Sequence, residues 1–431
     1  MPSPSPTRIQ PQARSPRLTP PQPHGPAATI SRRAADRLRS GHLWVYRSDI
    51  ETLTPAPTAT DLAPGTLLTV TDSRGLPLGS ALYSDTSEIA LRLVSPTPGL
   101  TREAYLADTR QRIASALALR AQLSPISPTD NAHRLLFSEA DNLPGIIADR
   151  YNDLIILQLL TQGTAQDDLR ALLTQSLTEA DPALTLWERP DPRIRELEHL
   201  AAPSPGPLHT STPDTPRTST LFTINGLRFH FEATSGQKTG AFLDQRLNYA
   251  AAASHAHGTA LDICTYQGGF ALHLAQRCTE VTGVDASRAA LEVADRNLAL
   301  NPHLPARTSW IEADAFDLLR EYDATHQQYD TIVLDPPAFA KSRRATEGAL
   351  RGYKELNLRA LRMLRPGGTL VTCSCSHHIP IEAFLQVVTA AATDAGRRVQ
   401  LLETRGASPD HPAILTLPET TYLKCLILRV D

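Results

Sequence analysis

The chain contains little cysteine and little lysine, and it lacks any long apolar run. The cysteines are Cys264, Cys278, Cys373, Cys375 and Cys425, an odd number at irregular spacing, which indicates reduced thiols rather than a disulfide framework. Lysine occurs four times, so arginine supplies most of the positive charge. No stretch approaches the roughly 18 apolar residues that a membrane span needs, and the N-terminus lacks the hydrophobic core of a signal peptide. We therefore expect a cytoplasmic protein with no membrane partner.

The length and composition indicate several folded domains. A chain of 431 residues, 41% of them hydrophobic, is long enough for about two to four domains with proper cores. The formal net charge is −3. Any contact with a nucleic acid must therefore come from local basic patches rather than from the overall charge.

Shifts in composition divide the chain into five segments. Residues 1–27 are rich in proline and contain no acidic residue, which predicts a disordered tail. Short strand-like runs separated by turn residues over 28–98 predict a small β-barrel. Over 99–200, a helix from 102 to about 123, several strands and a helix near 165–180 predict an α+β unit. A Pro-, Ser- and Thr-rich linker at 201–218 separates this unit from residues 219–431.

The last segment has the pattern of an α/β domain. It begins with a predicted hairpin on the turn Asn225-Gly226 and then alternates apolar strands with helical stretches. This alternation is typical of a doubly wound fold with a mainly parallel sheet. Ligands bind such sheets at the carboxyl ends of the strands, so the residues that follow the strands are the first candidates for a site.

Four acidic residues stand at the ends of four successive predicted strands: Asp262, Asp285, Asp314 and Asp335. Asp285 lies 23 positions after Asp262, where a carboxylate accepts hydrogen bonds from both ribose hydroxyls of a nucleoside cofactor. Asp314 is placed to contact the adenine. The turn after the first strand contains Gly268, Gly269 and Phe270 but lacks the G-x-G-x-x-G pattern that a pyrophosphate needs. Together, the acids and the turn predict a site for S-adenosylmethionine (SAM), which has no phosphate.

Two further segments place a thiol near a carboxylate. L-D-P-P-A-F ends an apolar strand at Asp335, and V-T-C-S-C-S-H-H, residues 371–378, ends another strand about forty residues later. Carbon 5 of cytosine is a poor nucleophile, but addition of a thiolate to carbon 6 gives carbon 5 enamine character, and it then attacks a sulfonium methyl group. Asp335 is placed to bind the Watson–Crick edge of the base. Such a base must be single-stranded or flipped out of a helix.

Several longer motifs extend from about residue 30 to the C-terminus. They are R-L-R-S-G-H-L-W-V-Y, R-L-L-F-S-E-A-D-N-L-P-G-I-I-A-D-R-Y, G-Q-K-T-G-A-F-L-D-Q-R, the glycine turn, D-P-P-A-F, T-C-S-C-S and D-H-P-A-I-L-T-L-P-E-T-T-Y-L-K. Through these motifs the chain resembles the RlmI-like family of bacterial SAM-dependent 23S rRNA methyltransferases, which make 5-methylcytosine.

The resemblance implies an architecture and a set of roles. It implies an N-terminal PUA-like RNA-binding barrel, a small α+β middle domain and a Rossmann-like class I methyltransferase domain. It also implies that Asp244 and Arg246 lie at the SAM pocket and that Cys375 is the nucleophile. The implied partner is 23S rRNA or a large-subunit precursor, and the oligomeric state, a homodimer included, stays open.

Two features leave other functions open. Many RNA cytosine-5 methyltransferases carry a second cysteine just after the D-x-P motif, but Pro336, Pro337, Ala338 and Phe339 stand here. Another base must therefore remove the carbon-5 proton. D-P-P-A-F also resembles the N/D-P-P-aromatic signature of amino methyltransferases, a reading in which Cys375 is structural. The alternatives are an RNA amino- or ring-nitrogen methyltransferase without a covalent step, and a non-catalytic RNA-binding ribosome assembly factor.

Arginines provide the candidate contacts to RNA. A short basic helix before the barrel carries Arg32, Arg33, Arg37 and Arg39, for which we favour phosphate contacts over a solvated face. Arg343 and Arg344 follow D-P-P-A-F-A-K-S and are expected to hold the RNA backbone near the pocket. Cys373 is expected to pack in the core. No metal is expected, because the chain has no Cys-x-x-Cys pair.

Overall fold

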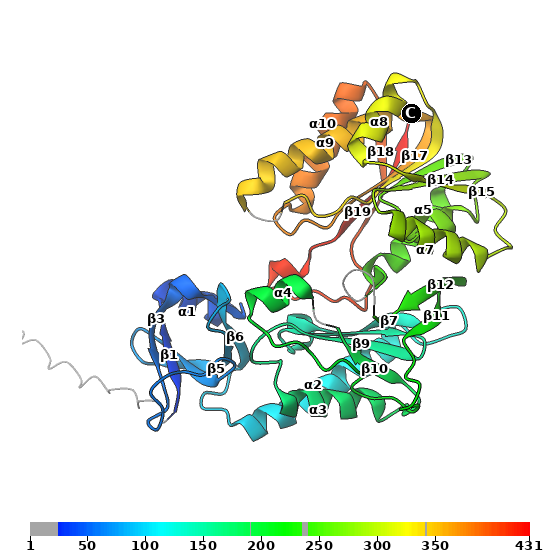
Figure 1. The fold of residues 1–431 in the computed structure, drawn as a ribbon. Coiled ribbons are helices and arrows are strands. Elements are labelled where there is room, and N and C mark those ends of the chain that lie inside the picture. Colours follow the sequence, from blue (N-terminus) through cyan, green and yellow to red (C-terminus); the bar gives the residue numbers. More distant parts are fainter. Residues whose placement is uncertain (1–24, 190, 235–239, 341–342) are drawn as a thin grey trace, which may run out of the picture.

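The computed structural model describes residues 25–189, 191–234, 240–340 and 343–431 (Figure 1). These residues form a six-stranded, a four-stranded, a two-stranded and a seven-stranded sheet. The predicted tail up to residue 24 and residues 236–239 of the G-Q-K-T-G motif lie outside the described residues. Among the residues described, no helix is long and apolar enough to span a membrane.

The N-terminal part is a six-stranded sheet with one short helix. Its strands are β1 (Ala27–Ile30), β2 (Trp44–Tyr46), β3 (Ile50–Thr54), β4 (Leu67–Asp72), β5 (Pro77–Tyr83) and β6 (Ile89–Ser95), in the order β2-β6-β5-β4-β1-β3. β1 runs parallel to β4, and the other neighbouring pairs are antiparallel. Helix α1 (Arg32–Arg39) begins after Ser31, whose hydroxyl accepts a hydrogen bond from the N–H of Ala34. The apolar face of α1 packs into the core of this sheet.

The middle part is a four-stranded sheet with helices on one face. Its strands are β7 (Ala132–Phe137), β8 (Ile146–Tyr151), β9 (Leu154–Leu159) and β10 (Thr185–Glu188), in the order β10-β9-β8-β7. Helices α2 (Arg102–Leu123) and α3 (Asp167–Thr178) cover one face and share a separate apolar core with it (Figure 1). Both predicted helices are confirmed, whereas α4 (Pro192–Leu197) was not predicted. Residues 201–218 contain no helix or strand in the described structure.

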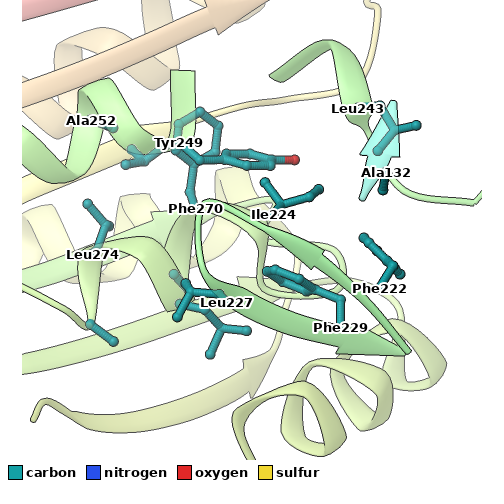
Figure 2. Packing of buried hydrophobic residues seen from close by; sticks show 14 of the residues in the cluster. Ala132, Phe222, Ile224, Leu227, Phe229, Leu243, Tyr249, Ala252, Phe270 and Leu274 are labelled. Atoms are coloured by element: carbon teal, nitrogen blue, oxygen red, sulfur yellow. The ribbon is translucent and has the colours of Figure 1, made fainter. Parts of the chain in front are cut away.

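A hairpin links the middle part to the C-terminal part. Its strands β11 (Ser219–Ile224) and β12 (Leu227–Glu232) pair across Asn225 and Gly226, whose φ angles of 49° and 82° suit the primed turn that Asn-Gly favours. The predicted hairpin is thus confirmed. Figure 2 shows Phe222 and Phe229 of the hairpin in the same apolar cluster as Tyr249 and Phe270, so this cluster joins the two parts.

The C-terminal part is a seven-stranded, mainly parallel sheet. Its strands are β13 (Thr259–Ile263), β14 (Glu280–Asp285), β15 (Arg307–Glu312), β16 (Tyr329–Leu334), β17 (Leu364–Ser374), β18 (Val399–Arg405) and β19 (Lys424–Val430), in the order β15-β14-β13-β16-β17-β19-β18. Only β19 runs antiparallel to its described neighbours. The strand order reverses between β13 and β16, which is where a doubly wound sheet opens a ligand crevice. The predicted α/β fold class is confirmed.

Helices cover both faces of this sheet (Figure 1). One face packs against α5 (Arg246–His255), α6 (Gly269–Leu274) and α7 (Arg288–Ala299), and the other against α8 (Ala315–Ala324), α9 (Thr346–Met363) and α10 (Ile381–Ala395). Side chains alternate between these cores along each strand: Val371 and Cys373 enter the first core, and Leu370 enters the second. β17 ends at Ser374, so Cys375 lies just beyond the strand.

Candidate active site

A cavity of about 900 Å³ opens at the carboxyl ends of the central strands of the seven-stranded sheet. The predicted site residues that line it are Asp244, Gly269, Phe270, Asp285, Asp314, Asp335 and Cys375. The predicted residues that do not line it are Gly268, Asp262 and Arg246. The structure therefore brings most of the predicted cofactor residues and the predicted nucleophile into one space.

The turn after β13 holds the carboxylate of Asp285. Its backbone is unusual because Cys264 and Tyr266 both have positive φ, at 64° and 51°. In this conformation the N–H of Tyr266 donates to Asp285 Oδ2 at 2.9 Å, while the N–H of Ser287 donates to Oδ1 at 2.9 Å. Non-glycine residues in this region cost of order 1–3 kcal/mol and cluster at functional sites. The strained turn fixes the acid at the cavity wall.

The two glycines of this turn are required for different reasons, Gly268 by its backbone conformation and Gly269 by packing. Gly268 has a φ of 83°, a conformation that favours glycine. A Cβ at Gly269 would lie 2.6 Å from the Cζ atom of Tyr249, a contact that a real side chain does not make. Close packing of α6 against α5 therefore explains Gly269, where the sequence suggested only a cofactor turn.

Asp262 supports the turn from beneath the cavity. It is fully buried, and its Oδ2 accepts hydrogen bonds from the Thr265 hydroxyl at 2.5 Å and the Ala271 N–H at 2.9 Å. Its Oδ1 has no partner in the described structure. Burial raises the pKa of Asp262 to about 7, although these two hydrogen bonds oppose the shift. Asp262 therefore joins the turn to α6 and does not face a ligand.

Asp335 and Cys375 leave two neighbouring parallel strands. β16 and β17 pair up to Leu334 and Thr372, and Asp335 and Cys375 follow within three residues. The thiol of Cys375 donates to the carbonyl oxygen of Pro336 at 3.9 Å. A thiol and a carboxylate thus share one wall of the cavity, as the sequence suggested.

Tyr353 of α9 fixes the backbone around this wall. It is buried, and its hydroxyl lies 3.0 Å from the Ser374 hydroxyl and 3.1 Å from the Ser376 hydroxyl. Ser376 Oγ also accepts from the N–H of Ala340, 3.2 Å away in the segment that follows Asp335. Burial raises the pKa of Tyr353, and the charges of Cys375 and Asp335 raise it further. This network fixes the two segments that carry the Cys375 thiol and the Asp335 carboxylate relative to each other.

The opposite wall comes from the C-terminal segment and the middle sheet. The Tyr422 hydroxyl donates to Asp244 Oδ2 at 2.5 Å. Arg134 of β7 makes two hydrogen bonds of 2.8 Å to Asp149, and its guanidinium lies 5.0 Å from the ring centre of Phe137. All but Asp149 line the cavity. Sequence reasoning did not single out Arg134, Phe137 or Tyr422, although each lies inside a motif that carried the resemblance.

The cavity also reaches the N-terminal sheet. The indole N–H of Trp44, in β2, donates to Glu139 Oε1 of the middle part at 2.8 Å, and both residues line the cavity. Its walls are therefore built by all three parts of the chain. This hydrogen bond also shows that Trp44 has a polar partner outside its own sheet.

Arg246 has a structural setting. Its guanidinium hydrogen-bonds to the Ser124 hydroxyl and lies 3.5 Å from Asp410 Oδ1. Asp410 is fully buried; its backbone carbonyl accepts from Arg120, and its Oδ2 accepts from the Arg134 N–H. Arg246 thus joins α5 to the middle part and does not line the cavity.

The predicted RNA-binding arginines of α1 lie outside the cavity and have acidic neighbours. Arg33 and Arg37 pair with Asp49 at 2.9 and 2.5 Å. Arg39 pairs with Asp72 at 2.6 Å, and Arg32 lies 3.8 Å from Asp36. Their role in binding RNA stays a prediction.

The structure describes the side chain of one of the two arginines that follow D-P-P-A-F. Arg344 is exposed near the start of α9, whereas the side chain of Arg343 lies outside the described residues. In the described part of the chain, no group of three His, Cys, Asp or Glu residues could hold a metal ion.

Two models of known protein families match most of the chain. Residues 141–429 match the family model of S-adenosylmethionine-dependent methyltransferases, and residues 28–96 match that of the PUA-like domain. The ribosomal RNA large subunit methyltransferase I of Shewanella amazonensis is 36% identical over 393 residues, covering 90% of this chain and 95% of that protein. The protein of the same name from Tolumonas auensis is 36% identical over 394 residues, with the same coverage.

Solved structures share the fold. A candidate SAM-dependent methyltransferase from Streptococcus mutans superposes with a TM-score of 0.76 at 18% identity, over 94% of this chain and 99% of that one. A methyltransferase structure in complex with S-adenosylhomocysteine (SAH) gives the same values. The predicted PUA-like and methyltransferase domains and the predicted cofactor, SAM, are confirmed by these findings.

The residues present fit SAM. The fixed carboxylate of Asp285 would hold the ribose hydroxyls, and Asp314 with Phe316 would border the adenine, because these residues end β14 and follow β15 at the cavity wall. Asp244, which also lines the cavity, would hold the ammonium group of the methionine part. These assignments stay predictions for the individual residues.

Replacing Asp285 should weaken cofactor binding. Asp285→Ala removes a carboxylate that accepts charge-assisted hydrogen bonds worth about 1.5–3 kcal/mol, so the Kd of SAH should rise roughly 10- to 100-fold. Isothermal titration calorimetry with SAH measures this change. Glu292→Ala, at an exposed position of the neighbouring helix α7, is the control and should leave the Kd unchanged. Equal Kd values for Asp285→Ala and the wild type would contradict the assignment.

Replacing Asp262 should change how stability depends on pH. The pKa of Asp262 is about 7 in the folded protein and near 4 in an unfolded chain. The stabilisation from its proton is therefore complete below about pH 4 and is lost as the pH rises through about 7. Asp262→Asn cannot ionise, so the Tm of the wild type should fall relative to that of the variant between about pH 4 and about pH 7. Parallel curves in differential scanning calorimetry would show that Asp262 does not titrate in this range. Asp295→Asn, exposed on α7, is the control.

Proposed function

Because the chain belongs to the SAM-dependent methyltransferase family that includes the ribosomal RNA large subunit methyltransferases I, we propose that it methylates carbon 5 of a cytosine in 23S rRNA. The proposed reaction passes through a covalent bond between Cys375 and the base. The proposed substrate is 23S rRNA or a precursor of the large subunit, in the cytoplasm.

One observation carries this proposal. The thiol of Cys375 and the carboxylate of Asp335 line the same cavity as Asp285 and Asp314, at the ends of adjacent strands. A methyltransferase acting on an exocyclic amine needs no thiol beside the base. Attack on carbon 6 requires a thiol beside the base-binding acid, and Cys375 follows the strand next to the one that Asp335 follows.

The proposed reaction begins with addition of the thiolate to the base and ends with its elimination. The thiolate of Cys375 forms a bond to carbon 6 of the cytosine, and the electron pair of the 5,6 double bond moves to carbon 5. SAM, when bound, would supply the methyl group: carbon 5 would bond to it as its bond to the sulfonium sulfur breaks, and S-adenosylhomocysteine would leave. A base then removes the proton from carbon 5, the 5,6 double bond forms again, and the bond between carbon 6 and sulfur breaks to return the thiolate.

Asp335 holds the base in this proposal. Its carboxyl group binds the Watson–Crick edge of the cytosine, where hydrogen bonding at nitrogen 3 and the amino group draws electrons out of the ring and favours addition at carbon 6. The backbone N–H of Asp335 donates to the carbonyl of Ile263 at 3.2 Å, and Ser376 anchors the following segment. These two hydrogen bonds therefore fix the backbone that carries the carboxylate of Asp335.

An RNA substrate accounts for the size and walls of the cavity. Its volume of about 900 Å³ lies near the upper end of the range of about 300–1,000 Å³ for ligand pockets. A flipped nucleotide must be taken out of its stack, at a cost of a few kcal/mol. Phe137, Trp44 and the guanidinium of Arg134 line the part of the cavity that faces the middle and N-terminal sheets, where they offer stacking surfaces.

A second candidate function rests on the D-P-P-A-F segment. Asp335 and the Pro336 carbonyl could together hold an exocyclic amine while the base is methylated on nitrogen. In this structure, however, the Pro336 carbonyl accepts from the Cys375 thiol. We therefore favour carbon 5, and nitrogen methylation is the alternative that the experiment separates.

Nucleoside analysis of 23S rRNA tests the proposal. Cells that lack the gene should lose one 5-methylcytidine, as measured by mass spectrometry, and the wild-type gene should restore it. Cys375→Ala should not restore it, because the other thiol among the described residues that line the cavity, Cys264, follows β13 and not β17. Cys373→Ala, two residues away but buried in the core, is the matched control and should restore the modification. Unchanged 5-methylcytidine with loss of another methylated nucleoside would establish nitrogen methylation instead.

A further inference from the structure

Lys424 is a buried cation in a chain whose positive charge comes almost entirely from arginine. It is 5% exposed and begins β19, where it pairs with Ser374 of β17. Its Nζ donates to the carbonyl oxygens of Ser376 and Tyr422, both at 2.7 Å. Ser376 directly follows Cys375, so the ammonium group lies against the backbone that carries the thiol.

A buried ammonium group needs an anion nearby. Unpaired buried charges are costly, so they are nearly always paired. Among the ion pairs of the described residues, none joins Lys424 to a carboxylate. Burial lowers the pKa of Lys424 to about 8, and the negative charge of Cys375 acts in the opposite direction. At neutral pH the side chain is therefore mainly an ammonium group, and a negative charge on Cys375 would stabilise it.

Among the described groups near Cys375, the carboxylate of Asp335 disfavours a thiolate. Asp335, at the end of β16, raises the pKa values of Tyr353 and Cys373 through its negative charge, after the larger effect of burial in each case. Tyr353 of α9 faces the same thiol and is neutral at physiological pH. His377, beyond Cys375, is exposed and contacts the Glu419 carbonyl at 3.0 Å. A carboxylate near a thiol disfavours its ionised form, so a nucleophilic Cys375 needs a compensating cation.

We propose that Lys424 is the positioning residue that supplies this cation: its ammonium group, held by the carbonyls of Ser376 and Tyr422, stabilises the thiolate of Cys375 from behind the cavity wall. Lys424 does not line the cavity and does not contact the base. It acts through Cys375 alone. Lysine suits this position better than arginine, because an ammonium group is compact and its protonation responds to burial. The inference rests on the proposed role of Cys375 as nucleophile.

The reactivity of Cys375 measures this effect without any RNA. Iodoacetamide alkylates thiolates and not thiols, so the rate of Cys375 labelling against pH, read from its peptide by mass spectrometry, gives the pKa of the thiol. Lys424→Met should raise this pKa by at least about one unit, and Lys424→Arg should restore part of the difference. Lys354→Met is the matched control and should leave the curve unchanged, because Lys354 lies on α9 in an exposed pair with Asp394 of α10.

The outcomes separate this inference from the proposed function. Identical labelling curves for Lys424→Met and the wild type would overturn the role of Lys424, whatever the RNA product is. A shifted curve in a protein that makes no 5-methylcytidine would keep the electrostatic pairing and refute the reaction. Cys264, whose pKa is raised by burial, lies in the same protein and reports any unfolding at high pH.

A second measurement covers the case in which Lys424→Met does not fold. Coupling between two charges is reciprocal, so removing the thiolate must lower the pKa of the lysine. Four lysines give few signals, and NMR of lysine labelled with carbon-13 at Cε resolves their titrations in the folded protein. The pKa of Lys424 should be lower in Cys375→Ala than in the wild type by at least about half a unit. Equal pKa values would overturn the proposal.

Discussion

The pairing of β16, β17 and β19 is the constraint on which the site depends. Parallel pairing of β16 with β17 ends both strands at one edge, which sets Asp335 and Cys375 on the same wall. Antiparallel pairing of β17 with β19 then brings Lys424 behind that wall, opposite Ser374. A slip of one residue in the pairing of β17 would turn its side chains to the other face of the sheet and would displace Cys375, which follows the strand. The same ladder therefore determines the place of the acid, the thiol and the buried cation.

A second constraint closes the cavity from the other side. The buried carboxylate of Asp410 lies 3.5 Å from the guanidinium of Arg246, and its pKa is lowered because ion pairing with His411 and Arg246 outweighs burial. Its backbone carbonyl accepts from Arg120 of α2, and its side chain accepts from the N–H of Arg134. One residue of the C-terminal segment thus ties the methyltransferase sheet to the middle part. This contact explains why the cavity has walls from separate parts of the chain.

The fold was largely predictable, and the site was predictable at the strand ends. The Asn-Gly hairpin and the helix at 102–123 follow from local patterns, and Asp285 and Asp335 follow from their positions after apolar strands. Side-chain direction was not predictable: Arg246 points to a buried carboxylate distant in sequence, and Asp262 supports the turn from below. The role of Lys424 was not predictable for the same reason. Its Nζ donates to the backbone carbonyl of Ser376, which is 48 residues away in sequence and is brought close by strand pairing.

A trapped adduct tests the central claim, covalent catalysis by Cys375, most directly. In 23S rRNA transcribed with 5-fluorocytidine, carbon 5 carries fluorine in place of the proton, so the final elimination cannot occur and the bond between sulfur and carbon 6 persists. With SAM present, the purified protein should form an adduct that survives denaturing electrophoresis, and mass spectrometry should place it on the peptide that contains Cys375. Methyl transfer to this RNA without any adduct would contradict the account.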